Sequence, residues 1–227
     1  MTSDSRARVA PRRGATRVAI RQISLAVGVG LGAAMAGACS LADPSLPPAQ
    51  YVAPAVGTVY RYAGFSNTVV GADGLRTRFV DDSGRQGLRV GLFISDDPRH
   101  PSRIDPAQLG ALWPLESEKQ TNVVVRNGSS AWLWRFKVLG VQDVTVPAGR
   151  FQTYLVQAVQ RPDSIRDPKA PRETVVGYTF WYAPSIGAVV RFRTTYYSGP
   201  AMGQVVESEL RAVERPPAAP GGRPTGS

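Results

Sequence analysis

AWLWRFKVLGVQDVTVPAGRFQTYLVQAV, residues 131–159, is the stretch that decides the fold. Large apolar side chains occupy every second position from Trp132 to Val138, and the basic residues Arg135 and Lys137 have the opposite parity. A period of two is typical of a half-buried strand. The sequence VPAG at 146–149 fits a tight turn, since proline fixes φ and glycine accepts positive φ. The stretch therefore predicts a long hairpin with a return strand over 151–159.

Turn signals and strand-like runs recur on both sides of this hairpin. Asn127-Gly128 is the strongest hairpin dipeptide in the chain. The runs between turns are rich in Val, Thr, Tyr, Phe and Trp, as strands favour. They predict strands over 58–62, 75–80, 88–95, 121–126, 131–141, 151–160, 173–182, 188–197 and 204–213. One short helix is expected over 105–112, with Asp105 as N-cap and Pro106 at the first position.

Short connections between neighbouring strands predict an all-β domain, mainly an antiparallel meander. We expect a curved open barrel or half-barrel, or a sandwich, with at most one short helix. The domain is expected over residues 57–215. A proline-rich linker over 39–56 should precede it, and a disordered tail over 216–227 should follow it.

The first 38 residues have the composition of a secretory signal. Six arginines and one aspartate give them a net charge of +5, half of the +10 of the whole chain. Residues 23–38 carry no charge, but sixteen residues are short for a bilayer span, which needs about 20. Much of the basicity therefore belongs to the leader, which argues against a nucleic-acid partner.

The sequence Met35-Ala36-Gly37-Ala38-Cys39-Ser40 resembles a bacterial lipobox. It departs from the usual pattern in having Ala36 where leucine is common. The resemblance implies cleavage before Cys39 and attachment of acyl chains such as palmitate to it, which would anchor the protein in a membrane. A cysteine close to an ordinary signal cleavage site is the alternative. In bacteria with two membranes, the non-acidic Ser40 implies the outer membrane rather than the inner one, with the domain facing the periplasm.

Two motifs in the second half resemble uncharacterised bacterial envelope proteins. They are VTVPAGRF at 144–151 and WYAPSIGAV at 181–189, similar to V-x-V-P-A-G-x-F and W-Y-A-P-x-x-G-x-V. Such proteins are similar to domains of unknown function with curved antiparallel sheets. The resemblance implies the fold and the compartment, and it offers no catalytic residue.

The sequence predicts no catalytic residue, metal ligand or cofactor. The single cysteine excludes an intrachain disulfide, and the single histidine, His100, lies in a loop beside Asp96 and Asp97. A solvated loop explains this cluster better than a metal site does, and no serine lies in a G-x-S-x-G elbow. A hydrolase built on unrecognised carboxylates remains a less favoured alternative.

A non-catalytic envelope lipoprotein is the functional prediction, binding either an apolar ligand or a partner protein. An apolar ligand could lie against a set of aromatic side chains: Trp132, Trp134, Phe136, Trp181 and Phe192. The alternative is a structural or assembly scaffold in which the same aromatic residues fill a closed core. Basic residues that share a parity could form a cationic patch on the outer face, namely Arg76 with Arg78, Arg135 with Lys137, and Arg191 with Arg193.

Overall fold

The computed structural model describes residues 46–128, 130–163 and 174–216. Within them the chain forms one antiparallel sheet of 12 strands, in the order β5-β4-β3-β2-β1-β12-β11-β10-β9-β8-β7-β6. The strands and the one helix are β1 (Val59–Tyr62), β2 (Phe65–Asp73), β3 (Arg76–Asp81), β4 (Gln86–Val90), β5 (Ile94–Asp96), β6 (Arg103–Ile104), α1 (Pro106–Gly110), β7 (Gln120–Asn127), β8 (Ser130–Val146), β9 (Gly149–Pro162), β10 (Val176–Ala183), β11 (Ala188–Tyr196) and β12 (Val205–Glu214). The predicted all-β meander with one short helix is confirmed.

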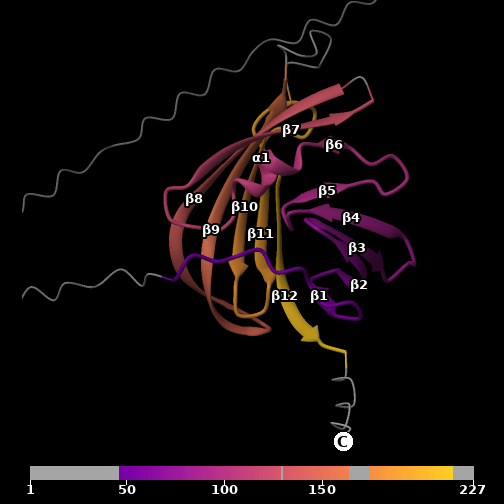
Figure 1. Ribbon diagram of the computed structural model, residues 1–227, viewed down its shortest axis with the longest axis vertical. Coiled ribbons are helices and arrows are strands. Elements are labelled where there is room, and N and C mark those ends of the chain that lie inside the picture. The colour runs from indigo at the N-terminus through magenta and orange to yellow at the C-terminus, as the bar shows by residue number, and fades with distance from the viewer. Residues whose placement is uncertain (1–45, 129, 164–173, 217–227) are drawn as a thin grey trace, which may run out of the picture. The chain divides into compact units, whose positions relative to one another are not determined.

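The sheet curls strongly but does not close. In Figure 1, β8 to β11 form a curved wall that faces β1 to β5, and α1 lies between the two sides. The edge strands β5 and β6 follow each other in the chain without pairing in the sheet order. Asp96 at the end of β5 accepts hydrogen bonds from the Ser102 amide at 2.9 Å and the Ser102 hydroxyl at 2.8 Å. The fold is therefore an open barrel whose edges are linked by a short loop.

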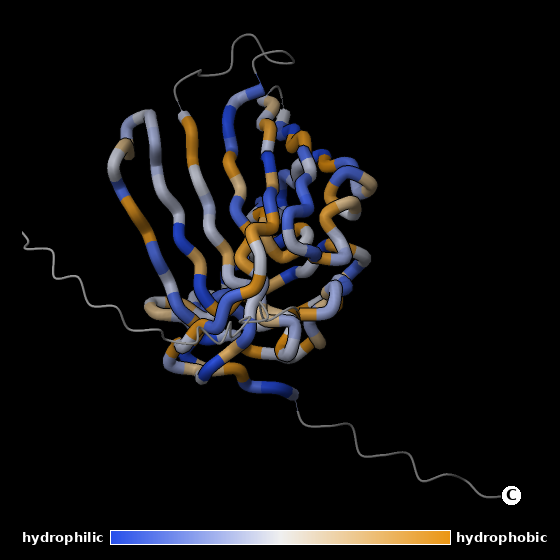
Figure 2. The backbone as a smooth tube through the Cα atoms, turned by 90° about the vertical axis from the view of Figure 1, so that its left-hand side faces the viewer, coloured by the Kyte–Doolittle hydropathy of each residue, from blue (hydrophilic) through white to orange (hydrophobic). Residues whose placement is uncertain are grey.

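The long hairpin forms as its sequence predicts, with β8 paired to β9 from Trp132–Pro162 to Val146–Gly149. Trp134, Phe136 and Val138 are buried, whereas Arg135 is exposed. Figure 2 shows apolar and polar positions alternating along the long strands. The alternation follows from the period of two, which sends neighbouring side chains to opposite faces.

A bulge in β8 divides the hairpin between two hydrophobic clusters. The register shifts between Val138 and Gly140, and Gly140 has a φ of 142°. Trp134, Phe136 and Val138 belong to the first cluster, whereas Val144 and Val146, of the same parity, belong to the second. A shift of one residue moves all later side chains to the other face. The far half of the hairpin therefore packs on different partners from the near half.

The first cluster is the larger of the two, and most of its residues come from α1 and from strands β4 to β11. Phe93 lies at its centre, with ring centroids 5.1 Å from Phe180, 5.9 Å from Trp113 and 6.1 Å from Phe136. Phe93 comes from the tight β4–β5 turn, Gly91-Leu92-Phe93, in which Gly91 and Leu92 both have positive φ. The predicted single strand over 88–95 is wrong here, because this turn divides it into β4 and β5.

The linker expected over 39–56 is described from residue 46 onward, and parts of it pack against the domain. Ala49 is buried and pairs with Leu115, and the Tyr154 hydroxyl donates to the carbonyls of Leu46 and Pro47 at 3.0 and 2.9 Å. Tyr51 reaches Thr77 on β3, with the two hydroxyl oxygens 3.3 Å apart. The segment thus crosses from the β9 side to the β3 side of the sheet (Figure 1). Apolar and carbonyl groups of this proline-rich stretch supply contacts that composition alone did not indicate.

Gly149 gives a direct test of the hairpin turn. Its φ is 134°, and an added Cβ would come no closer than 3.7 Å to the Phe151 ring, so the strain on a side chain here is purely conformational. We expect Gly149→Val to lower the free energy of unfolding by about 1–3 kcal/mol. Thr145→Val, on an exposed position of the same hairpin, serves as the control in urea denaturation. Equal midpoints for the two variants would contradict the turn geometry.

Candidate functional site

A pocket of about 310 Å³ remains open on the inner side of the curled sheet. One wall comes from β8 to β11 and includes Trp134, Tyr178, Phe180 and Phe192. The opposite wall comes from β4, β5 and the turn between them: Arg89, Leu92, Phe93 and Ser95. Ser95 is exposed, and Tyr178 and Phe192 are partly so, which leaves the pocket accessible from solvent. We call it the aromatic pocket.

Stacked rings form its main wall. The Tyr178 ring lies 4.8 Å from Trp134 and 5.9 Å from Phe180, with interplanar angles of 20° and 2°. This stack arises because Tyr178 and Phe180 share one face of β10, and Trp134 lies on the inner face of β8. Five of the eleven lining residues are aromatic, so rigid rings share the pocket surface with polar groups.

Five of the lining residues carry polar side-chain groups, and two of these residues pair with each other. The Tyr178 hydroxyl donates to Gln160 Oε1 at 2.8 Å. Burial, with a smaller contribution from the neighbouring Tyr196, raises the pKa of Tyr178 to about 12, so the phenol stays protonated at neutral pH. Arg89 is the one charged residue among those that line the pocket.

The five aromatic residues expected to line a ligand site do not all meet there. Trp134 and Phe192 line the aromatic pocket. Phe136 is fully buried and stacks on Trp134 at 5.8 Å, and Trp132 is a partly buried neighbour of the same cluster. Trp181 belongs to the second cluster, because it follows Phe180 and consecutive strand residues point to opposite faces. There it donates to Gln142 Oε1 at 3.2 Å and lies below the Arg191 guanidinium.

Several lining residues escaped sequence analysis. Leu92 and Phe93 lack any turn signal, so nothing indicated that they point inward. Tyr178 and Thr194 could have been found from parity, since they lie two residues from Phe180 and Phe192. Arg89 carried no signal beyond its charge.

The other candidate groups have ordinary structural roles. The His100 side chain is 78% exposed, and its Nδ1 lies 3.8 Å from Asp97. Across the described ranges, no three His, Cys, Asp or Glu side chains gather closely enough to hold a metal ion. Much of the expected cationic patch is neutralised, since Lys137 pairs with Glu118 and both Arg191 and Arg193 pair with carboxylates of β12.

The predicted lipidation site, Cys39, lies outside the described residues, as do the signal sequence over 1–38 and residues 217–227 of the expected tail. The part of the chain that is described contains no helix with the length and apolar character needed to cross a bilayer.

No family model matches this chain, and no curated protein sequence matches it. Solved structures with a similar course of the chain include the hypothetical lipoprotein YmcC from Escherichia coli, with a TM-score of 0.45 and 11% identity over 71% of this chain and 85% of that one. A presumed lipoprotein from Parabacteroides distasonis has a TM-score of 0.42 and 14% identity, covering 74% of this chain and 100% of that one. A presumed exported protein with a YmcC-like fold from Bacteroides fragilis has a TM-score of 0.40 and 14% identity, with the same coverages. At such identities the similarity extends to the course of the chain and not to the residues of a site.

Proposed function

We propose that this protein is a non-catalytic lipoprotein of the bacterial envelope, anchored through acyl chains on Cys39, whose β domain binds an apolar ligand. The leader and the lipobox-like sequence around Cys39 support the anchor. Ser40 favours the outer membrane, with the domain facing the periplasm. The aromatic pocket supports ligand binding, and it is the observation that carries the proposal.

The size and walls of the pocket suit a small apolar group. Ligand pockets typically measure about 300–1,000 Å³. At about 310 Å³ the aromatic pocket lies at the lower end, large enough for one ring system or one folded acyl segment. The stacked rings of Trp134, Tyr178 and Phe180 offer apolar area without the entropy cost of ordering flexible side chains.

Blocking the pocket tests this proposal. Thr194 lines it from β11, and its neighbour Thr195 points to the opposite face of the same strand. We expect Thr194→Trp to fill the space and weaken binding of a fluorescent fatty acid by about tenfold or more, which is about 1.4 kcal/mol. Thr195→Trp adds the same side chain outside the pocket and should bind as the wild type does.

Fluorescence titration of the purified full-length protein and both variants measures the effect. Equal binding by the two variants would place the ligand elsewhere. Absence of saturable binding by the wild type would favour the alternative, a scaffold whose aromatic residues serve only to fill the core.

A further inference from the structure

Arg89 reaches the aromatic pocket without a carboxylate partner. Within the described ranges the groups beside its guanidinium are neutral: the Phe79 ring, 5.2 Å from the guanidinium carbon, and the Asn67 amide oxygen, 3.1 Å from Nη2 when that amide is oriented to satisfy both of its atoms. Arg89 is half-buried, and removing a charge from water without an opposite charge costs free energy. An anion bound beside it would offset that cost.

Two further cavities lie near the aromatic pocket, one of which shares lining residues with it. Arg89, Leu92 and Val189 also line a small cavity of about 10 Å³, together with Tyr60 and Pro54. Tyr60 and Pro54 in turn line a second chamber of about 370 Å³. Arg89 thus lines both the aromatic pocket and the small cavity, and the small cavity in turn shares lining residues with the second chamber.

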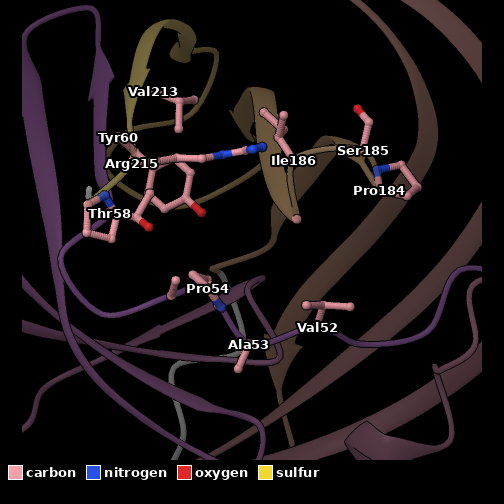
Figure 3. Close-up of a pocket in the computed structure, with 13 residues that line it drawn as sticks. Val52, Ala53, Pro54, Thr58, Tyr60, Pro184, Ser185, Ile186, Val213 and Arg215 are labelled. Atoms are coloured by element: carbon pink, nitrogen blue, oxygen red, sulfur yellow. The ribbon is translucent and has the colours of Figure 1, made fainter. Parts of the chain in front are cut away.

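The second chamber carries another unpaired arginine. Figure 3 shows the Arg215 side chain beside Tyr60, reaching toward Ile186, with Val52 and Pro54 on another side of the chamber. Within the described ranges Arg215 forms no ion pair, and no aspartate or glutamate lines any of the three cavities. Burial raises the pKa of Tyr60 to about 12, and the neighbouring Tyr62 and Tyr182 contribute to this increase. The positive charges of Arg215 and Arg89 act to lower the same pKa.

We infer that the ligand is an amphipathic anion, with its apolar part in the aromatic pocket and its carboxylate or phosphate group at Arg89. This inference rests on the proposed function. The pocket supplies apolar area, and Arg89, which has no carboxylate partner within the described ranges, supplies a positive charge at its wall. Arginine suits either head group, because its planar fork can donate two parallel hydrogen bonds.

Three ligands with one chain and different heads test the inference: dodecanoate, dodecyl phosphate and dodecanol, each displacing a fluorescent fatty acid from the full-length protein. We expect at least one of the two anions to bind about tenfold to a hundredfold more tightly than the alcohol, as a charge-assisted hydrogen bond provides. The tighter anion identifies the head group. Arg89→Met should remove this preference and leave dodecanol binding unchanged, whereas Arg89→Lys should keep part of it.

Arg76→Met is the matched control, since Arg76 is exposed on β3 and lines none of the three cavities. It should retain the full preference. Equal affinities of the wild type for all three ligands would overturn the inference. An equal loss of affinity for all three ligands in Arg89→Met would overturn it as well. Neither result would contradict the proposal that the pocket binds an apolar ligand. If none of the ligands bound saturably, the proposed function would fall together with it.

Discussion

Replacing Cys39 with alanine is expected to abolish acyl labelling of the protein and to release it from the membrane into the soluble envelope fraction. Cys39 is the only cysteine in the chain, so no other thiol could accept a diacylglycerol group. Each buried methylene contributes about 0.8 kcal/mol to membrane binding, and stable anchoring takes at least two chains. Removing the thiol removes the whole anchor at once, which makes this effect all-or-none.

Metabolic labelling with a fatty acid, followed by membrane fractionation, measures both outcomes. Ser40→Asp is the companion variant, because it keeps the thiol. It should remain labelled, and an acidic residue after the cysteine should retain it in the inner membrane. Undiminished labelling of Cys39→Ala would refute the lipoprotein assignment, and wild-type protein found only in the inner membrane would refute the sorting.

The anchor would hold the domain close to the membrane. Leu46 already packs against the first cluster, and Tyr154 hydrogen-bonds to its carbonyl. Leu46 is seven positions after Cys39, and a fully extended chain over seven positions spans about 25 Å at most. The domain would therefore remain within reach of lipids at the surface to which it is anchored.

Phe93→Ala is expected to cause the largest loss of stability. Phe93 is 4% exposed, and its ring lies near four others, those of Trp113, Phe136, Phe180 and Tyr182. Truncating a buried phenylalanine leaves a cavity that the surrounding rings cannot fill, at a cost of about 3–5 kcal/mol. The loss should be large because Phe93 joins the β4–β5 turn to the wall formed by β8 to β10.

Equilibrium unfolding in urea measures this cost. Val70→Ala, on β2 and 44% exposed, is the control and should change the free energy of unfolding by less than about 0.5 kcal/mol. Similar unfolding midpoints for the two variants would mean that the β4–β5 turn does not enter the core.

The sequence predicted the meander because local signals and the global fold agree at the hairpins. Asn127-Gly128 and VPAG at 146–149 specify tight turns, and the flanking strands alternate as a half-buried sheet requires. The expected helix over 105–112 forms as the shorter α1, with Asp105 accepting a hydrogen bond from the Ala107 amide at 2.9 Å. Such features depend on a few neighbouring residues and are therefore visible without tertiary information.

What the sequence did not predict depends on partners far along the chain. β2 is half polar and contains Gly71, so it has little propensity of its own and forms by pairing with β1 and β3. The turn that carries Leu92 and Phe93 is apolar because its side chains enter the core formed by other strands. The bulge after Val138 likewise places Val144 and Val146 in the second cluster although they share the parity of Trp134 and Phe136, which a parity rule applied along the chain cannot foresee.

Native mass spectrometry of the membrane-extracted protein, compared with the Thr194→Trp and Thr195→Trp variants, tests the central claim most directly. The account predicts one amphipathic molecule with a carboxylate or phosphate group bound per chain in the wild type and in Thr195→Trp, and its loss in Thr194→Trp. Wild-type protein that carries no small molecule, or a molecule retained equally by both variants, would contradict it.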